Sequence, residues 1–154
     1  MASKNIYKLP FDEKLNFSPE PAPFHYESKS LINAVDFAMN VGTPVLAALE
    51  GKVWEVIDEY GEGRSDKSFL DKCNFVAIKH ANEEYSLYVH LKKGILVKEG
   101  DAVKQGDVIG YSGISGFNTY PHLHFDIRND KWQTIPIKFK IRNKIKVLKS
   151  PSYY

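Results

Sequence analysis

The chain has 154 residues, of which 43% are hydrophobic and 26% are charged, and this is the composition of one ordinary globular domain. No apolar run approaches the roughly 18 residues that span a bilayer, no signal peptide is visible after Met1, and the single cysteine, Cys73, excludes an internal disulfide and a multi-cysteine metal site. The net charge is +2, but it is unevenly distributed: residues 1–130 are acidic overall, whereas every charged side chain of residues 131–154 is basic. Because most of the chain is acidic, we do not expect a nucleic acid as the partner.

The first 30 residues contain four prolines, at positions 10, 19, 21 and 23. Because proline fixes its own φ and removes a backbone donor, this composition predicts an irregular leader that packs on the core rather than a helix. We expect one domain over residues 31–149 and a short tail over residues 150–154.

Short apolar runs that end at Gly or Asn follow the leader. They cover Pro44–Leu49, Val53–Ile57, Phe75–Ile78, Tyr85–Leu91 and Val108–Tyr111. No run keeps a helical period, so the pattern predicts an all-β fold, a sandwich or a barrel. The stretch Val97–Gly110 repeats a Val-x-x-Gly pattern, with glycines at positions where turns are expected.

Two further segments contain many charged residues. Gly61–Lys72 is charged and predicts an exposed loop. The segment Lys138–Val147 alternates basic and apolar residues, which predicts a strand with one cationic and one apolar face. That strand is either an edge strand protected by lysines or a cationic surface for a polyanionic cell wall.

The strongest chemical signal is the pair His122 and His124 in Pro121–Ile127. On a strand, side chains two residues apart point the same way, so the two imidazoles lie together while Leu123 and Phe125 pack on the other face. A metal ion favours such a pair because each ligating imidazole is neutral. Two surface histidines without a metal are the alternative.

Three further residues stand within apolar runs. A carboxylate such as Asp36 is costly there unless it is paired or bound to a metal. Since zinc accepts both imidazole nitrogen and carboxylate oxygen, Asp36 is a candidate ligand. His90 follows Tyr88 by two residues, so we expect the tyrosine on the same face of the strand, while His80 falls at a strand end and is expected to be structural.

The ordered set of these segments resembles the lysostaphin-type (LytM-type) zinc metallopeptidases. The resemblance covers nearly the whole chain and rests on Asn33–Met39, Gly42–Val45, Asn74–His80, Tyr88–Leu91, Gly110–Gly113 and Pro121–Phe125. It implies an antiparallel β barrel-like sandwich of the duplicated hybrid motif type, and zinc-dependent hydrolysis of peptide bonds in peptidoglycan bridges or stems.

Carried over to this chain, the resemblance makes Asp36 and His124 zinc ligands, and His90 and His122 the histidines beside the metal-bound water. The usual first ligand stands four residues before the aspartate, where this chain has Ile32. We expect His25, farther upstream, to replace it. Tyr120 stands where a glycine commonly precedes the Pro-His pair and is expected to narrow the cleft.

The sequence is also compatible with other functional hypotheses. Ile32 favours a non-catalytic relative that binds or regulates cell-wall hydrolases, and Ser65–Ser68 faintly resembles the lysine turn of lipoyl domains at Lys67. The main expectation is a monomeric zinc endopeptidase whose partners are peptidoglycan peptides. We expect it in the periplasm or outside the cell, with a cytoplasmic location also compatible with the sequence.

Overall fold

The computed structural model describes residues 1–15, 17, 19–22, 25, 31–61, 73–115 and 120–151. The predicted loop Gly61–Lys72, apart from Gly61, lies outside the described residues, and so does Lys67. Within the described part, no helix is long and apolar enough to cross a membrane.

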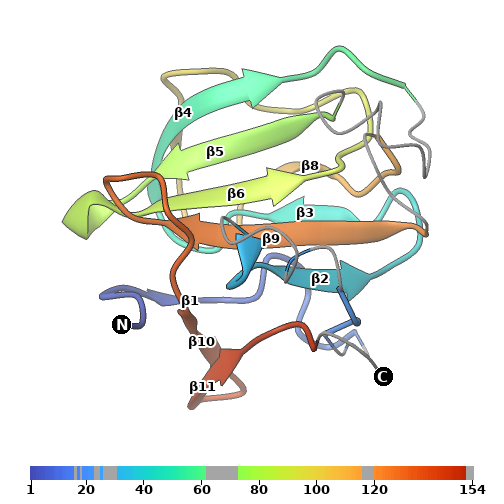
Figure 1. The fold of residues 1–154 in the computed structure, drawn as a ribbon. Coiled ribbons are helices and arrows are strands. Elements are labelled where there is room, and N and C mark those ends of the chain that lie inside the picture. Colours follow the sequence, from blue (N-terminus) through green and yellow to red (C-terminus); the bar gives the residue numbers. More distant parts are fainter. Residues whose placement is uncertain are drawn as a thin grey trace.

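A six-stranded antiparallel sheet forms the main body of the fold (Figure 1). Its strand order is β2-β9-β6-β5-β4-β7, with β2 (Val35–Ala38), β4 (Gly51–Ile57), β5 (Phe75–Lys79), β6 (Tyr85–Val89), β7 (Ala102–Val103) and β9 (His122–Arg128). A short 3-10 turn, η3 (Ala81–Glu83), joins β5 to β6. The strands β2, β9 and β6, which lie far apart in the sequence, are direct neighbours here.

Two smaller sheets complete the described fold. One pairs β3 (Pro44–Leu46) with β8 (Val108–Tyr111), and the other has the order β1-β10-β11, with β1 (Ile6–Tyr7), β10 (Ile137–Ile141) and β11 (Lys144–Leu148). The prediction of an all-β, mainly antiparallel sandwich is confirmed, although the sheets of the described residues do not close into a barrel.

The core occupies one face of the six-stranded sheet. Phe37, Tyr88 and Phe125 are fully buried there, and they belong to one cluster with Val45 of β3 and Ile109 of β8. Because side chains alternate along a strand, the neighbouring positions of β2 and β9 project from the opposite face. That opposite face carries the polar residues described below.

The leader contributes to this core, and its described residues include one short strand. Residues Ile6–Tyr7 form β1, which pairs in parallel with β10. The Tyr7 side chain is fully buried, and its hydroxyl donates a 2.9 Å hydrogen bond to Glu84 Oε1. A strand forms here because Tyr7 can fill the core while the backbone of β10 satisfies its polar groups.

The Val-x-x-Gly repeat produces two matching turns. Gly100 and Gly106 both have φ +92°, a conformation that side chains with a Cβ rarely adopt. In each turn the aspartate that follows accepts a hydrogen bond from the backbone N–H of a lysine three residues earlier, at 3.0 Å for Asp101 and 2.8 Å for Asp107. These turns bound β7 and lead into β8.

The predicted single strand over Lys138–Val147 is wrong, because the chain turns back at Arg142 and Asn143 to make the hairpin β10–β11. Both residues have positive φ, as the two central residues of a type I′ turn require. The turn shifts the alternation, so that Lys140 stands opposite Ile145 on one face of the hairpin. Basic and apolar side chains therefore share both faces, and β11 is an edge strand of its sheet.

His80 is structural, as expected. Its ring is buried, with Nδ1 2.7 Å from the Glu50 carbonyl oxygen and Nε2 2.7 Å from Ser86 Oγ. Burial lowers the pKa of His80 below its usual value, and this outweighs the opposing effects of Glu50 and Glu84. The ring therefore stays neutral in the folded protein at pH values where it would be protonated in the unfolded chain.

This burial predicts a pH-dependent stability. Below about pH 6.5 the unfolded chain takes up a proton on His80 that the folded protein does not, so the free energy of unfolding falls as the pH drops. Urea denaturation of metal-free protein at pH 7.5 and pH 5.5 should show a smaller fall for His80→Gln than for the wild type. Equal falls in the two proteins would contradict this account of His80.

Candidate metal and catalytic site

The pairing of β2 with β9 brings the central residues of the site together. Asp36 stands opposite His124, and Ala38 opposite His122, in an antiparallel register. Opposite residues share a face of the sheet, so Asp36, His122 and His124 project from the face away from the core. The intervening Phe37, Leu123 and Phe125 are fully buried on the other side, and their burial fixes which face the polar residues occupy.

The leader delivers His25 to the same place. Its Nε2 lies 3.3 Å from Asp36 Oδ1, and His124 Nδ1 lies 3.2 Å from the same oxygen. The three side chains are buried, with 4 to 7% of each residue exposed, and one ligand atom from each lies within 4.8 Å of the others. Ile32, which stands where the resemblance places the first ligand, offers no ligand atom, so His25 is the third potential ligand in this cluster.

The chemistry of the cluster fits a divalent metal. Burial alone would raise the pKa of Asp36, but the neighbouring imidazoles of His124, His25 and His122 outweigh it and hold that pKa well below its usual value. The buried Oδ1 atom of Asp36 has no hydrogen-bond partner among the described residues, although two ring nitrogens face it. Two imidazoles and one carboxylate are a common catalytic zinc set, which leaves a fourth position for water or substrate.

His90 and His122 form a second pair beside this cluster. Their ring centroids are 4.6 Å apart, and His122 Nε2 lies 3.6 Å from Asp36 Oδ2. In each ring Nδ1 lies close to a backbone carbonyl oxygen, that of Ser115 at 2.6 Å for His90 and that of Tyr120 at 2.8 Å for His122. These contacts occupy Nδ1, so Nε2 is the nitrogen of each ring that is available for chemistry.

Both rings are held neutral. Burial lowers the pKa of His90 to about 3, with His122 and His124 adding to the effect. Burial also lowers the pKa of His122 and outweighs the opposing effect of Asp36. Each neutral ring has a lone pair that can accept a proton near neutral pH, although the lowered pKa makes His90 a weak base.

The backbone at His90 explains how this ring reaches the site. By alternation from Tyr88, His90 would point into the core, but its φ of +69° turns the chain and brings its ring next to His122. The expectation that Tyr88 shares its face is therefore wrong. The Tyr88 hydroxyl is buried and accepts hydrogen bonds from Ala48 N at 2.9 Å and from Ser86 Oγ at 2.8 Å. A non-glycine residue at positive φ is uncommon, and such residues occur both in turns and at functional sites.

Tyr120 borders the pair, since its ring centroid is 4.7 Å from that of His122 and the two rings are tilted by 36°. Tyr120 thus lies beside the histidine pair. That it narrows the cleft stays a prediction.

Sequence reasoning gave no role to Asp126 and Arg128, which continue the polar face of β9. Asp126 Oδ2 lies 2.8 Å from His124 Nε2, and Asp126 Oδ1 lies 2.9 Å from Arg128 Nε. Burial raises the pKa of Asp126, but His124 and Arg128 outweigh it, so the carboxyl has a lowered pKa. Asp126 and Arg128 follow His124 at intervals of two residues, so alternation along the strand could have placed both on its face.

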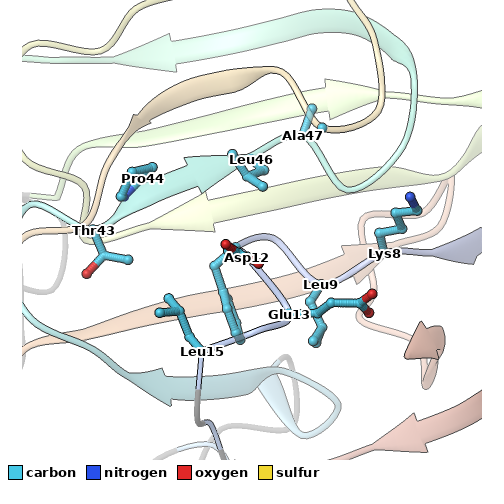
Figure 2. Close-up of a pocket in the computed structure, with 11 residues that line it drawn as sticks. Lys8, Leu9, Asp12, Glu13, Leu15, Thr43, Pro44, Leu46 and Ala47 are labelled. Carbon is cyan, nitrogen blue, oxygen red and sulfur yellow. The ribbon is translucent and has the colours of Figure 1, made fainter. Parts of the chain in front are cut away.

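A separate hollow lies between the leader and β3 (Figure 2). It has a volume of about 670 Å³ and is lined by Leu9, Leu15, Pro44 and Leu46, with Asp12 and Glu13 along the leader. None of the histidines lines it, so it is distinct from the metal cluster.

Comparison with known families matches residues 30–136 to peptidase family M23. This segment is more than half of the chain. The chain belongs to peptidase family M23. M23 peptidases are zinc metallopeptidases, and the His25–Asp36–His124 cluster is suited to that cofactor. His25 itself precedes the matched segment, so its place in the cluster rests on the geometry alone.

One relative of this M23 chain is named for its action on peptidoglycan. Peptidoglycan DD-endopeptidase ShyA of Vibrio cholerae is 36% identical over 124 residues, which cover 78% of this chain and 26% of that protein. The chain spans about a third or less of the length of the curated relatives it matches.

Solved structures agree with this assignment. The catalytic domain of the antimicrobial peptidase lysostaphin from Staphylococcus simulans superposes with a TM-score of 0.52 at 33% identity, covering 74% of this chain and 77% of that one. A zinc containing peptidase from Vibrio cholerae gives a TM-score of 0.57 at 28% identity, covering 93% of this chain and 39% of that one. The family, fold class and cofactor expected from the sequence are thereby confirmed.

Proposed function

We propose that this M23 chain is a zinc-dependent endopeptidase that hydrolyses peptide bonds in bacterial peptidoglycan. The observation that carries the proposal is the buried set His25, Asp36 and His124 beside the neutral pair His90 and His122. The relative ShyA, a peptidoglycan DD-endopeptidase, supports this substrate class. We accordingly expect action in the periplasm or outside the cell, as a monomer.

His25, Asp36 and His124 would hold the metal through Nε2, a carboxylate oxygen and Nδ1, the atoms that face one another. Zinc bound there would supply a Lewis acid that activates water and polarises the scissile carbonyl group. The Asp36 charge would partly balance the cation, because its lowered pKa keeps it ionised.

His90 and His122 would move the proton. A neutral imidazole can take the proton of the attacking water and later pass it to the leaving amine. The second imidazole would stabilise the developing oxyanion only in its protonated form, because its Nδ1 proton already goes to a backbone carbonyl oxygen and a neutral ring has none on Nε2. The backbone carbonyls of Ser115 and Tyr120 fix the orientation of the two rings, so their Nε2 atoms are held for these roles.

Purified protein incubated with peptidoglycan, followed by mass spectrometry of the released fragments, tests the proposal. We expect new amino and carboxyl termini within stem or bridge peptides, loss of activity with 1,10-phenanthroline and recovery with added zinc. Asp36→Ala, which removes a ligand from the buried cluster, should release no fragments. Protein that takes up no zinc and binds peptidoglycan without cleaving it would instead support the non-catalytic alternative that Ile32 suggests.

A further inference from the structure

The two ring nitrogens of His124 face different carboxylates. Nδ1 lies 3.2 Å from Asp36 Oδ1 within the metal cluster, and Nε2 lies 2.8 Å from Asp126 Oδ2 behind it. Asp126 is completely buried. Since an ionised carboxylate only accepts hydrogen bonds, the short contact requires a proton on Nε2. The Nδ1 atom can then present its lone pair to a metal.

Arg128 holds the Asp126 carboxylate in turn. Its Nε lies 2.9 Å from Oδ1, and its second contact runs from Nη2 to Oδ2 at 3.3 Å. A buried carboxylate without such partners would be strongly unfavourable. The guanidinium also lies 5.1 Å from the centre of the Trp132 ring, so it contacts both the carboxylate and an aromatic ring.

Within the part of the chain that the structure describes, the other histidines of the site have no such carboxylate behind the ring. The rings of His90 and His122 contact neutral backbone carbonyl oxygens, and the buried Nδ1 of His25 has no hydrogen-bond partner among the described residues. A carboxylate behind a ligating imidazole fixes its tautomer and raises its basicity. His124 is therefore the potential ligand whose tautomer and ring orientation are fixed most firmly by neighbouring residues.

We propose that Asp126 is a positioning residue that fixes the ring of His124 so that Nδ1 serves as the zinc ligand, and that Arg128 fixes Asp126. This inference rests on the metal site of the proposed function. It is independent of which peptide bond the enzyme cleaves.

Zinc affinity, measured by competition with a chromophoric chelator, tests the role without relying on activity. Asp126→Leu should weaken zinc binding by about 10- to 100-fold, the range typical for loss of such a partner. Asp126→Asn keeps an acceptor oxygen but loses the charge, so its zinc affinity should lie between that of the wild type and that of Asp126→Leu. Arg128→Gln should also weaken zinc binding, but by a smaller factor than Asp126→Leu.

Glu84→Gln is the matched control. Glu84 is also a buried carboxylate with several partners, but it contacts Lys4, Asn5 and Tyr7 rather than the metal cluster. A purely structural effect would weaken zinc binding equally in the Asp126 and Glu84 variants, once circular dichroism has shown that both are folded. Nitrogen-15 NMR of the zinc-loaded wild type should also show His124 protonated at Nε2.

Folded Asp126→Leu protein with wild-type zinc affinity, or His124 protonated at Nδ1, would overturn the proposal. Wild-type protein that binds zinc but releases no fragments from peptidoglycan would contradict the proposed function alone, and the affinity series would still decide the role of Asp126. A wild type that binds no zinc would overturn both.

Discussion

His124→Ala is expected to lose the zinc ion, whereas His122→Ala keeps it, although both variants lose peptidoglycan hydrolysis. The two residues lie on the same face of β9, yet their contacts differ. His124 Nδ1 lies 3.2 Å from the Oδ1 atom that His25 also faces. His122 Nε2 lies farther away, 3.6 Å from the other carboxylate oxygen, and contacts the ring of His90.

Zinc per chain, measured by atomic absorption after gel filtration, separates the two roles. We expect about one zinc in wild type and His122→Ala, in line with a three-ligand site, and little in His124→Ala. Hydrolysis by His122→Ala should fall by about 10²- to 10⁴-fold, the usual contribution of a general acid or base. Equal loss of zinc from the two variants would contradict this division.

His90→Ala is expected to lower kcat by a similar factor, about 10²- to 10⁴-fold, with zinc retained. The ring of His90 lies 4.6 Å from that of His122 and 6.1 Å from that of His124, measured between ring centroids, which suits contact with a reacting group. Steady-state kinetics on a defined peptide substrate, with zinc quantified in the same sample, measures the effect.

The backbone at position 90 calls for a second variant. At φ +69° alanine is strained, whereas asparagine tolerates this conformation better. His90→Asn should therefore fold as well as the wild type and still show the loss in kcat. A near-normal kcat for His90→Asn would show that His90 is needed for the backbone conformation and takes no part in catalysis.

Local spacing predicted the centre of the site. The i, i+2 pair on β9 and the isolated carboxylate Asp36 could be placed on strands from the sequence alone, because the buried residues between them define the faces. The register that sets Asp36 opposite His124 is a long-range property. The sequence could suggest it only through the resemblance to a family.

Other features depend on backbone geometry that leaves a weak signal. Nothing in the residue type of His90 indicates its positive φ, so alternation placed Tyr88 on the wrong face. In the tail, Asn143 was a turn signal, but the nearly regular alternation on either side of it favoured one long strand over the observed hairpin. The approach of His25 depends on the path of the leader across the sheet, which no local pattern specifies.

Zinc content of the native protein beside His25→Ala, both purified without chelators, tests the central claim most directly. His80→Gln is the matched control, because His80 is also buried but contacts Glu50 and Ser86 away from the cluster. We predict about one zinc per chain in the wild type and the control, and much less in His25→Ala. Full zinc in His25→Ala would contradict the ligand set, and no zinc in the wild type after zinc is added back would contradict the metallopeptidase itself.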